Sequence, residues 1–303
     1  MRNRKKVNIA IIILLTFLII LFIPCRIHKA FNQKKKVSNK ISFFQPVIDS
    51  LIVRGVDSSF VIGLVMHPKM KFNEKYVKIN VTGYLKKTDY SSNYNKHSVR
   101  KCRKFYKTHK PLLKKAERQY NIPAQVITSV LWVETKFGKY TGRHHLPSVF
   151  FSTALSNQYE FIQMNLRELE KHNITDPLLL DSLTKKVYTR ALKKSSWAME
   201  QILYLDTAVK KQALPINEIS GSWAGAFGLC QFIPSSYVRW AVDGNGDGKI
   251  DLFNLDDAVF SIANYLKSNG WTKNYNDKRV ALHHYNNSEQ YVNAILILAT
   301  RVR

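Results

Sequence analysis

Apolar residues recur at helical spacing through most of the chain. In residues 122–142 they are separated by four, three and four positions, at Val126, Val130, Val133 and Phe137. This spacing places them on one face of a helix. Pro123 suits the first turn because it lacks an N–H, and Gly138 suits the end because glycine accepts a left-handed backbone. The pattern therefore predicts an amphipathic helix that packs one face against the body of the protein.

Similar patterns predict most of the remaining secondary structure. Helical spacing covers residues 43–55, 109–121, 166–172 and 184–212, a helix start lies at 234–236, and an apolar helix begins at Tyr291. Val77, Ile79 and Val81 alternate with polar residues, which predicts a short strand that ends before Gly83. Residues 91–98 predict a loop. The fold class expected from these elements is mostly α, with a small β component.

The N-terminal residues differ in composition from the rest. Residues 1–6 form a basic leader, and residues 7–25 are apolar almost throughout. We expect the second segment to be an uncleaved transmembrane signal anchor, because no small-residue cleavage site follows it. A cleaved signal peptide and a lipoprotein modified at Cys25 are the alternatives. Residues 26–42 are then a basic linker to an exported, folded region at 43–303.

Positive charge is concentrated in the first part of the chain. Residues 1–121 hold 27 Lys or Arg and 5 Asp or Glu, whereas residues 122–303 hold 20 and 16, for a formal net charge of +26. No zinc-finger spacing, RNP-like motif or recognition helix accompanies this charge, so we expect no nucleic-acid partner. In an exported chain we expect the basic surface to lie against anionic lipid head groups or an anionic cell-wall polymer. A merely solvated basic face is the alternative.

Glu134 is the candidate for acid–base chemistry. It lies near the end of the helix predicted at 122–142, beside Trp132, Val133 and Phe137. Burial penalises the charged carboxylate, so we expect a raised pKa. A carboxylic acid that keeps its proton near neutral pH can protonate a glycosidic oxygen. A solvent-facing glutamate one turn before a helix end is the alternative interpretation.

The segment DGNGDGKID has the pattern of a calcium loop. Oxygen donors stand at its first, third, fifth and seventh positions: Asp243, Asn245, Asp247 and the backbone carbonyl of Lys249. The regular loop closes with a glutamate, but that position is Asn254 here. Asp256 or Asp257 can close a longer loop instead. An ordinary Asx turn without an ion is the alternative.

Several other chemistries have no support in the sequence. Cys25, Cys102 and Cys230 are too widely spaced for a metal site. We expect separate thiols, with a Cys102–Cys230 disulfide as the alternative for an exported chain. The histidine pairs lack metal-ligand spacing, and phosphate-binding glycine loops and the G-x-S-x-G motif are absent. Nucleotide and esterase chemistry are therefore not expected.

Two tyrosines close to the C-terminus are candidates for sugar binding. Tyr285 and Tyr291 are six residues apart, and Tyr291 begins an apolar helix. Stacking on a sugar ring at the wall of a cleft is the functional interpretation. Buried aromatic core is the alternative.

Four ordered motifs together resemble the B-type lytic murein transglycosylases. They are VETKFGKYTG from residue 133, GSWAGAFGLCQFIPSSY from 221, VDGNGDGKIDLFNLDDA from 242 and YNNSEQY from 285. The resemblance covers residues 122–299, and extends more weakly back to residue 43. It implies a lysozyme-like fold, a mostly helical α+β body, behind the N-terminal membrane anchor.

The resemblance also implies roles for individual residues. Glu134 corresponds to the family's catalytic acid. The substrate-binding positions correspond to Ser222, Gln231, Tyr285, Asn286 and Tyr291. The ligands of a structural calcium ion correspond to Asp243, Asn245, Asp247, Lys249 and Asp257. The chain departs from the family in lacking an Arg pair that often follows the Glu134 helix, and in having Cys230 where a small apolar residue is usual.

The implied activity is cleavage of the β-1,4 bond between N-acetylmuramic acid and N-acetylglucosamine in peptidoglycan, which leaves a 1,6-anhydro ring. Glu134 acts first as acid and then as base, while the C6 hydroxyl of the substrate attacks, so no cofactor is needed for the chemistry. The implied location is the bacterial cell envelope. The implied partners are peptidoglycan glycan strands, the membrane and cell-wall enzyme complexes. A lysozyme-type hydrolase, a non-catalytic glycan-binding protein and a calcium-dependent interaction module are the alternatives.

Overall fold

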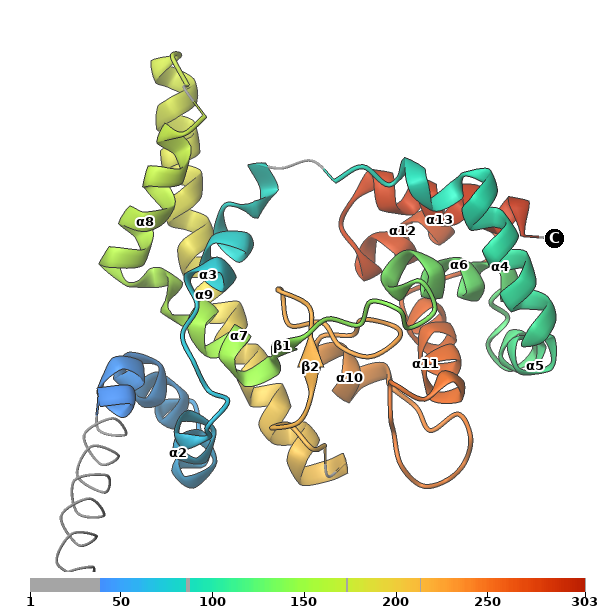
Figure 1. Cartoon of the computed structure of the whole chain (residues 1–303), viewed down its shortest axis with the longest axis horizontal. Coiled ribbons are helices and arrows are strands. Elements are labelled where there is room, and N and C mark those ends of the chain that lie inside the picture. Colours follow the sequence, from blue (N-terminus) through green and yellow to red (C-terminus); the bar gives the residue numbers. More distant parts are fainter. Residues whose placement is uncertain (1–38, 86–87, 173, 213, 303) are drawn as a thin grey trace, which may run out of the picture.

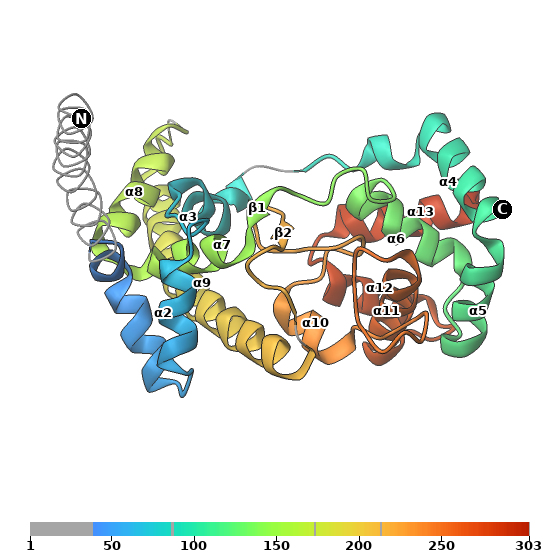
Figure 2. The same cartoon turned by 60° about the horizontal axis from the view of Figure 1, so that its bottom comes forward.

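The computed structural model describes residues 39–85, 88–172, 174–212 and 214–302. Within these ranges the chain is mostly helical, and its strands are one antiparallel pair. The helices gather in two lobes, with the strand pair and the segment at 220–233 between them (Figure 1, Figure 2). The expected fold class is confirmed in its mostly helical character. The anchor expected at residues 7–25 lies outside the described residues, and none of the helices searched in the described part has the length and apolar content to cross a bilayer.

The first lobe is built around a long helix, α9. Its members are the helix at residues 39–53, α2 (Ser58–Met66), α3 (Glu74–Val81), α7 (Leu146–Ala154), α8 (Tyr159–Glu170) and α9 (Pro177–Gln212). Helices α3, α7 and α8 all pack against α9. Phe150 of α7 and Ala198 and Ile202 of α9 are fully buried in this core. The apolar face predicted for the segment 184–212 is therefore the face that holds the lobe together.

The second lobe surrounds α6, the helix that carries Glu134. Its members are α4 (Lys96–Thr108), α5 (Lys110–Tyr120), α6 (Ala124–Thr135), α11 (Leu255–Ser268), α12 (Tyr275–Tyr285) and α13 (Glu289–Arg301). Helices α4, α5, α11 and α13 pack against α6. Ile127, Val130 and Leu131 are fully buried between them. Burial on several sides holds α6, and with it Glu134, in one position.

A short strand pair and one helix connect the lobes. Strand β1 (His144–His145) pairs antiparallel with β2 (Ser220–Gly221). Helix α10 (Pro234–Trp240) packs against both α9 and α11. At the strand pair the backbones approach so closely that a Cβ on Gly142 would lie 2.1 Å from the carbonyl of Gly221. The chain therefore needs glycine at this contact.

The strand expected at Val77–Val81 is a helix, α3, and the sequence-based prediction was wrong. The Asn73 side chain caps the helix by accepting a hydrogen bond from the Lys75 N–H at 3.0 Å. Val77 and Val81, four residues apart, are fully buried on one helical face, whereas Ile79 is 41% exposed. In a strand, the alternation would place all three side chains on one face. Packing against α7 and α9 instead favours a helix, in which Val77 and Val81 share a face and Ile79 does not.

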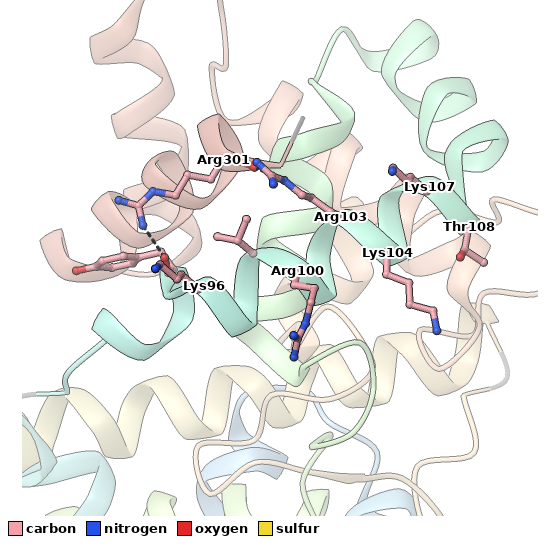
Figure 3. A pocket seen from close by; sticks show the side chains of 9 residues that line it. Lys96, Arg100, Arg103, Lys104, Lys107, Thr108 and Arg301 are labelled. Atoms are coloured by element: carbon pink, nitrogen blue, oxygen red, sulfur yellow. Dashed lines mark hydrogen bonds between the residues drawn. The ribbon is translucent and has the colours of Figure 1, made fainter.

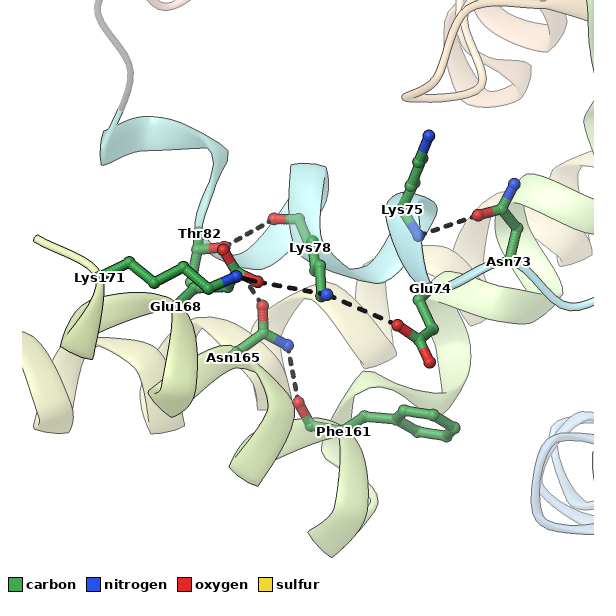
Figure 4. Close-up of polar contacts among 9 residues, drawn as sticks. All are labelled: Asn73, Glu74, Lys75, Lys78, Thr82, Phe161, Asn165, Glu168 and Lys171. Carbon is green, nitrogen blue, oxygen red and sulfur yellow. Dashed lines mark hydrogen bonds and ion pairs between the residues drawn. The ribbon is translucent and has the colours of Figure 1, made fainter.

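Polar contacts fix α3 against α8 (Figure 4). Glu168 of α8 accepts from Lys78 of α3 at 3.2 Å and from Lys171 at 2.8 Å. Such partly exposed ion pairs contribute at most about 1 kcal/mol each. Below them the Thr82 hydroxyl donates to the fully buried Asn165 at 3.3 Å. The buried bond specifies how the two helices align, because breaking it would leave an unpaired polar group in the core.

The loop expected at 91–98 is shorter than predicted. Residues Ser91–Tyr94 form a 3-10 helix, η2, and α4 already begins at Lys96. Asn95 caps α4 by accepting from the Ser98 N–H at 2.9 Å. The polar residues that suggested a loop are thus the capping residues of a helix.

Candidate active site

Helix α6 ends just after Glu134, earlier than the sequence suggested. Its last residue is Thr135 and its C-cap is Lys136, so the stop expected at Gly138 comes one residue too late. Lys136 and Phe137 already have left-handed backbones, with φ of 52° and 60°. Such conformations cost energy in residues other than glycine and persist only where the surroundings hold them.

The end of α6 is tied to the segment at 220–233. The Thr135 hydroxyl donates to the carbonyl of Leu229 at 3.0 Å and accepts from the Gly138 N–H at 3.0 Å. The N–H of Leu229 in turn donates to the carbonyl of Leu252 at 2.7 Å. A fully buried threonine therefore connects the Glu134 helix to the next motif along the chain.

The carboxyl group of Glu134 is bound by a tyrosine from the other end of the sequence. The Tyr291 hydroxyl, at the start of α13, donates to Glu134 Oε1 at 2.6 Å. Tyr291 is almost completely buried, whereas Glu134 keeps part of its surface exposed. A reacting group can therefore reach Glu134 while Tyr291 holds its orientation.

Burial raises the pKa of Glu134 to about 7, from an ordinary value of 4.5. Desolvation is the largest cause. The hydrogen bond from Tyr291 and the positive charge of Lys136 act in the opposite direction and lower the pKa. Within the described residues, no second carboxylate contributes to the shift. At neutral pH this group exists in both protonation states, which suits a residue that must give up a proton and take one back.

The apolar side chains next to Glu134 in sequence pack in a cluster with α4. Phe137, which was expected with Trp132 and Val133 beside the acid, stacks on Phe105 of α4 with 3.9 Å between ring centres. Trp132 packs in the same cluster against α4 and α13. These side chains hold the helix, while aromatic residues from α12, α13 and the segment before α4 lie near the acid.

Tyr285 and Tyr90 complete the aromatic surroundings of Tyr291. Tyr285, at the end of α12, stacks on Tyr291 with ring centres 6.3 Å apart, and its hydroxyl donates to the carbonyl of Cys230 at 2.6 Å. Tyr90 meets Tyr291 edge-on at 5.9 Å. Burial and the charge of Glu134 both raise the pKa of Tyr90, while a hydrogen bond with Asn286 lowers it. Tyr285, Asn286 and Tyr291 thus lie together near Glu134. Tyr291 is 1% exposed, so it belongs to the buried aromatic core, the alternative to a surface on which a sugar stacks.

Sequence reasoning missed Tyr90. It lies in a short polar segment, TDYSSN, that carries no motif and no periodicity. Its position beside Tyr291 results from the packing of η2 against α13. Local sequence patterns cannot reveal a contact between residues about two hundred positions apart.

Gln231 and Ser222 lie in the same loop but are used differently. Gln231 has a left-handed backbone, with φ of 52°, and its side-chain NH₂ donates to the carbonyls of Thr141 and Gly228 at 3.2 and 3.0 Å. It borders a cavity of about 290 Å³ together with Tyr285. The Ser222 hydroxyl accepts from the N–H groups of Ala224 and Ala226, at 3.3 and 3.1 Å. Ser222 therefore folds its own loop, and no contact connects it to Glu134.

The calcium-loop residues form a separate structure between α10 and α11. Asp243 accepts from the N–H groups of Gly246 and Gly248, at 2.6 and 2.7 Å. Asp257, fully buried at the start of α11, accepts from the N–H groups of Gly244 and Asp251, at 2.8 and 2.7 Å, and so joins both ends of the loop.

The donor chemistry of this loop fits a calcium ion. Its oxygens are carboxylate, amide and carbonyl groups, which Ca²⁺ prefers. Among the described residues, no Lys, Arg or His forms an ion pair with Asp243, Asp247 or Asp257. However, no three acidic, histidine or cysteine side chains in the described part of the chain converge as a metal site. A complete ligand set therefore needs the amide of Asn245 and the carbonyl of Lys249 as well.

Cys102 and Cys230 are free and fully buried. Cys102 belongs to the cluster beneath α4, whereas Cys230 belongs to the main core. Burial raises the pKa of the Cys102 thiol to about 12 and that of Cys230 higher still. Separate thiols, the expected state, are what the structure contains, and neither is reactive at neutral pH.

Comparison with known proteins identifies the family. Residues 66–281 match the family described as "Transglycosylase SLT domain". The chain belongs to this family. The match spans most of the chain and includes Glu134, Gln231 and the loop at 243–257.

Among curated proteins, this SLT-domain chain is similar to the membrane-bound lytic murein transglycosylase B of Escherichia coli (strain K12). The two are 32% identical over 169 residues, which is 56% of this chain and 37% of that protein. The chain thus aligns with little more than a third of that relative's length.

Solved structures show the same lysozyme-like transglycosylase fold. The E. coli lytic transglycosylase SLT35, in complex with calcium, has a TM-score of 0.64 at 18% identity and covers 86% of this chain and 92% of its own. SltB3 from Pseudomonas aeruginosa, in complex with NAG-anhNAM-pentapeptide, has a TM-score of 0.62 at 17% identity, with 86% and 78% covered. At these identities the likeness concerns the fold.

Proposed function

We propose that this SLT-domain chain is a peptidoglycan lytic transglycosylase. It cleaves the β-1,4 bond between N-acetylmuramic acid and N-acetylglucosamine and leaves a 1,6-anhydro-muramyl end. The observation that carries the proposal is the Glu134 carboxyl group, with a pKa raised to about 7 and the Tyr291 hydroxyl 2.6 Å away. Membership of the transglycosylase family supports the same conclusion.

The reaction uses one carboxyl group twice. Glu134 donates its proton to the glycosidic oxygen as the bond to C1 of the muramyl sugar breaks. The acetamido group of the substrate stabilises the positive charge that develops at C1. The C6 hydroxyl of the same sugar then attacks C1 and returns a proton to Glu134, so no water is consumed. The absence of any second carboxylate among the groups that shift the Glu134 pKa, within the described residues, agrees with this scheme.

Neighbouring side chains bind the substrate and orient the acid. Tyr291 orients the Glu134 carboxyl group, and Tyr285 supports Tyr291 by stacking. Asn286 offers its amide group to the sugar substituents, and Gln231 offers its amide oxygen, since its NH₂ already donates to two backbone carbonyls. Ser222 acts by shaping the loop before Gln231, since its hydroxyl already accepts two backbone N–H groups.

Mass spectrometry of digested peptidoglycan tests the proposal. The expected products carry the 1,6-anhydro ring and are lighter by one water than the products of a lysozyme. Products with reducing ends would instead make the protein a hydrolase. An absence of any cleavage, with glycan binding retained, would make it a non-catalytic wall-binding protein.

The loop at 243–257 binds a structural calcium ion in this proposal. Asp243, Asn245 and Asp247 supply side-chain oxygens, the Lys249 carbonyl supplies another, and Asp257 closes the set. The pattern of the loop and the absence of described ion pairs to its carboxylates support this. SLT35 is described as a complex with calcium. The ion takes no part in the chemistry, and its effect is on the stability of the loop.

The cellular location follows from the composition of the N-terminal residues. Residues 7–25 anchor the chain in a membrane of the bacterial cell envelope, after a leader at 1–6. A basic linker at 26–42 leads to the exported catalytic region at 43–303. The relative from E. coli carries "membrane-bound" in its name, which supports an envelope location.

A further inference from the structure

A groove of about 740 Å³ lies on the outer face of the second lobe, between α4 and the end of α13 (Figure 3). Six cationic side chains line it: Lys96, Arg100, Arg103, Lys104, Lys107 and Arg301. The remaining described lining residues are Tyr94, Val99 and Thr108, so no acidic side chain is among the lining residues that the structure describes. All six cations are exposed and thus available to a partner.

None of the six cations forms an ion pair with an acidic side chain of the described residues. Five of them follow one face of α4 over residues 96–107, a length of roughly 16 Å at 1.5 Å per residue. Arg103 donates to the backbone carbonyl of Arg301 at 2.9 Å, which joins α4 to the end of α13 (Figure 3). Arg301 is itself fixed by donating to the carbonyl of Tyr94 at 2.6 Å. Such a concentration of like charge raises the local potential and attracts multivalent anions.

The groove adjoins the Glu134 site through two segments. Tyr90 contacts Tyr291 beside Glu134, and Tyr94 is four residues further on, roughly 8 Å along the 3-10 helix η2. Helix α13 begins near Glu134 with Tyr291 and ends at the groove with Arg301, a separation of roughly 15 Å. A polymer that places one sugar at Glu134 therefore has neighbouring parts within reach of the groove.

We propose that this groove binds the carboxylates of the stem peptides on the peptidoglycan strand that occupies the Glu134 site. The inference rests on the proposed function, which supplies the substrate. Stem peptides repeat along a glycan strand and carry several carboxylates each, and arginine forks bind carboxylates with two parallel hydrogen bonds.

A membrane surface fits the groove less well. Helices that lie on a bilayer carry large apolar side chains that enter the lipid. None of the large apolar residues exposed in the described structure belongs to α4 or α13. The face is hollowed and lined by cationic side chains, which suits separate anionic groups on a chain.

The experiment measures binding in a Glu134→Gln background, so that the substrate is not consumed. The groove variant is Arg100→Glu with Lys104→Glu, two exposed side chains on the same side of α4 (Figure 3). The matched control is Lys193→Glu with Lys211→Glu, two lysines of α9 in the other lobe. The ligands are isolated glycan strands with stem peptides, and the same strands after an amidase has removed the peptides. Thermal melting verifies that each variant is folded.

We expect the groove variant to bind peptide-bearing strands about tenfold more weakly, equivalent to about 1.4 kcal/mol, and the control to change less than about twofold. Binding to peptide-free strands should be equal in all three proteins. Unchanged binding of peptide-bearing strands would overturn the proposal. An equal loss on both kinds of strand would also overturn it, since the groove would then not read the peptides.

Two further outcomes distinguish binding of stem peptides from binding of a different polyanion and from failure of the proposed function. If the groove variant keeps its affinity for peptide-bearing strands but loses binding to phosphatidylglycerol vesicles or to duplex DNA, the groove serves another polyanion and the proposal is wrong. Failure of the proposed function appears elsewhere, in the products made by the protein with Glu134 intact. A binding difference without 1,6-anhydro products would leave a peptide-binding groove on a protein that is not a transglycosylase.

Discussion

At the scale of single residues, the proposed chemistry centres on the pair formed by Glu134 and Tyr291. The acid needs a proton near neutral pH, and desolvation supplies the raised pKa. The Tyr291 hydroxyl favours the charged form and so prevents the pKa from rising further. Because Tyr291 is buried and stacked on Tyr285, it cannot turn away from the carboxyl group. The protonation state of Glu134 is thus set by packing as much as by the hydrogen bond.

Glu134→Gln should reduce turnover ~100-fold or more, because the amide keeps the shape of the side chain but cannot donate a proton. Affinity for glycan strands should stay within about twofold of the wild type, since binding and proton transfer are separate contributions. Turnover is measured from the release of muropeptides, and affinity from co-sedimentation with sacculi. A variant that remains active would show that another group is the acid.

The raised pKa of Glu134 also makes stability depend on pH. The folded state keeps this proton up to about pH 7, whereas the unfolded chain loses it near 4.5. Over that interval the folded state binds more protons, so the free energy of unfolding decreases as pH rises. The loss of stability caused by the buried Glu134 charge is absent below pH 4.5 and complete above about pH 7.

Glu134→Gln removes this dependence. Relative to the wild type, the variant should gain up to about 3 kcal/mol of stability between about pH 4 and pH 8. Urea unfolding of both proteins at the two pH values measures the gain. Any constant effect of the amide cancels in the comparison, and an identical difference at both pH values would contradict the assigned pKa.

At the scale of elements, the glycine-rich loop fixes the distance between α6 and the calcium-type loop. Gly228 has a φ of +75°, and a Cβ there would lie 2.4 Å from the Cβ of Leu252. The adjacent Leu229 connects to Thr135 of α6 and to Leu252. An added methyl group would push these segments apart directly behind Glu134.

Gly228→Ala should therefore cost about 2–4 kcal/mol of stability and lower activity, because it combines an unfavourable backbone with a clash in packed surroundings. Gly55→Ala is the matched control. Gly55 has a similar φ of +84° but no atom within 4 Å of an added Cβ, so only the backbone cost of about 1 kcal/mol applies. Denaturant unfolding of both variants measures the difference. Equal losses would mean that the loop adapts to the methyl group.

The loop at 243–257 leads to a prediction about calcium. If the ion binds the folded state only, it stabilises the protein by mass action. The melting temperature should rise on addition of calcium and fall with a chelator, and Asp247→Ala should abolish both changes. Asp49→Ala, an exposed carboxylate on the helix at 39–53, is a control that should keep the calcium response. If the melting temperature of the wild type does not change with calcium, the loop does not bind the ion and this part of the proposal is wrong.

At the scale of the whole molecule, the two lobes carry different features. The second lobe carries Glu134, its aromatic neighbours and the cationic groove, while the first lobe packs around α9 and contacts the segment at 220–233 through β1 and β2. The basic excess noted in residues 1–121 is thus partly explained: the run at 96–107 forms one wall of a groove. The remaining excess includes residues outside the described ranges.

Deletion of residues 1–30 should yield a soluble protein that still cleaves isolated peptidoglycan, since every proposed site residue, from Tyr90 onward, lies beyond the deleted segment. Its binding to sacculi should weaken as salt increases, because exposed charges are screened at about 10 Å in 0.1 M salt. Co-sedimentation across a salt series gives the measurement. Salt-insensitive binding would show that the basic surface is not an attachment surface.

The sequence by itself determined the helical character, the family and the order of the motifs. Helical periodicity is local, so the helical segments at 109–121 and 184–212 could be predicted from spacing alone. The motif around Glu134 could be recognised because its residue types are dictated by chemistry and by tight turns. The wrong prediction also came from a local pattern. The spacing of Val77 and Val81 is compatible with a strand or a helix, and packing against α7 and α9 favours the helix.

Only the tertiary structure decided which side chains meet. Tyr291 reaches Glu134 across 157 positions of sequence, and Tyr90 joins them from a segment with no pattern of its own. Ser222, by contrast, uses its hydroxyl to hold its own loop. The pKa of Glu134 depends on desolvation by such distant neighbours, and the groove depends on Arg301 meeting Arg103 of α4. Local sequence specifies which conformations a segment prefers, but burial and charge proximity arise only when segments far apart in the chain are packed together.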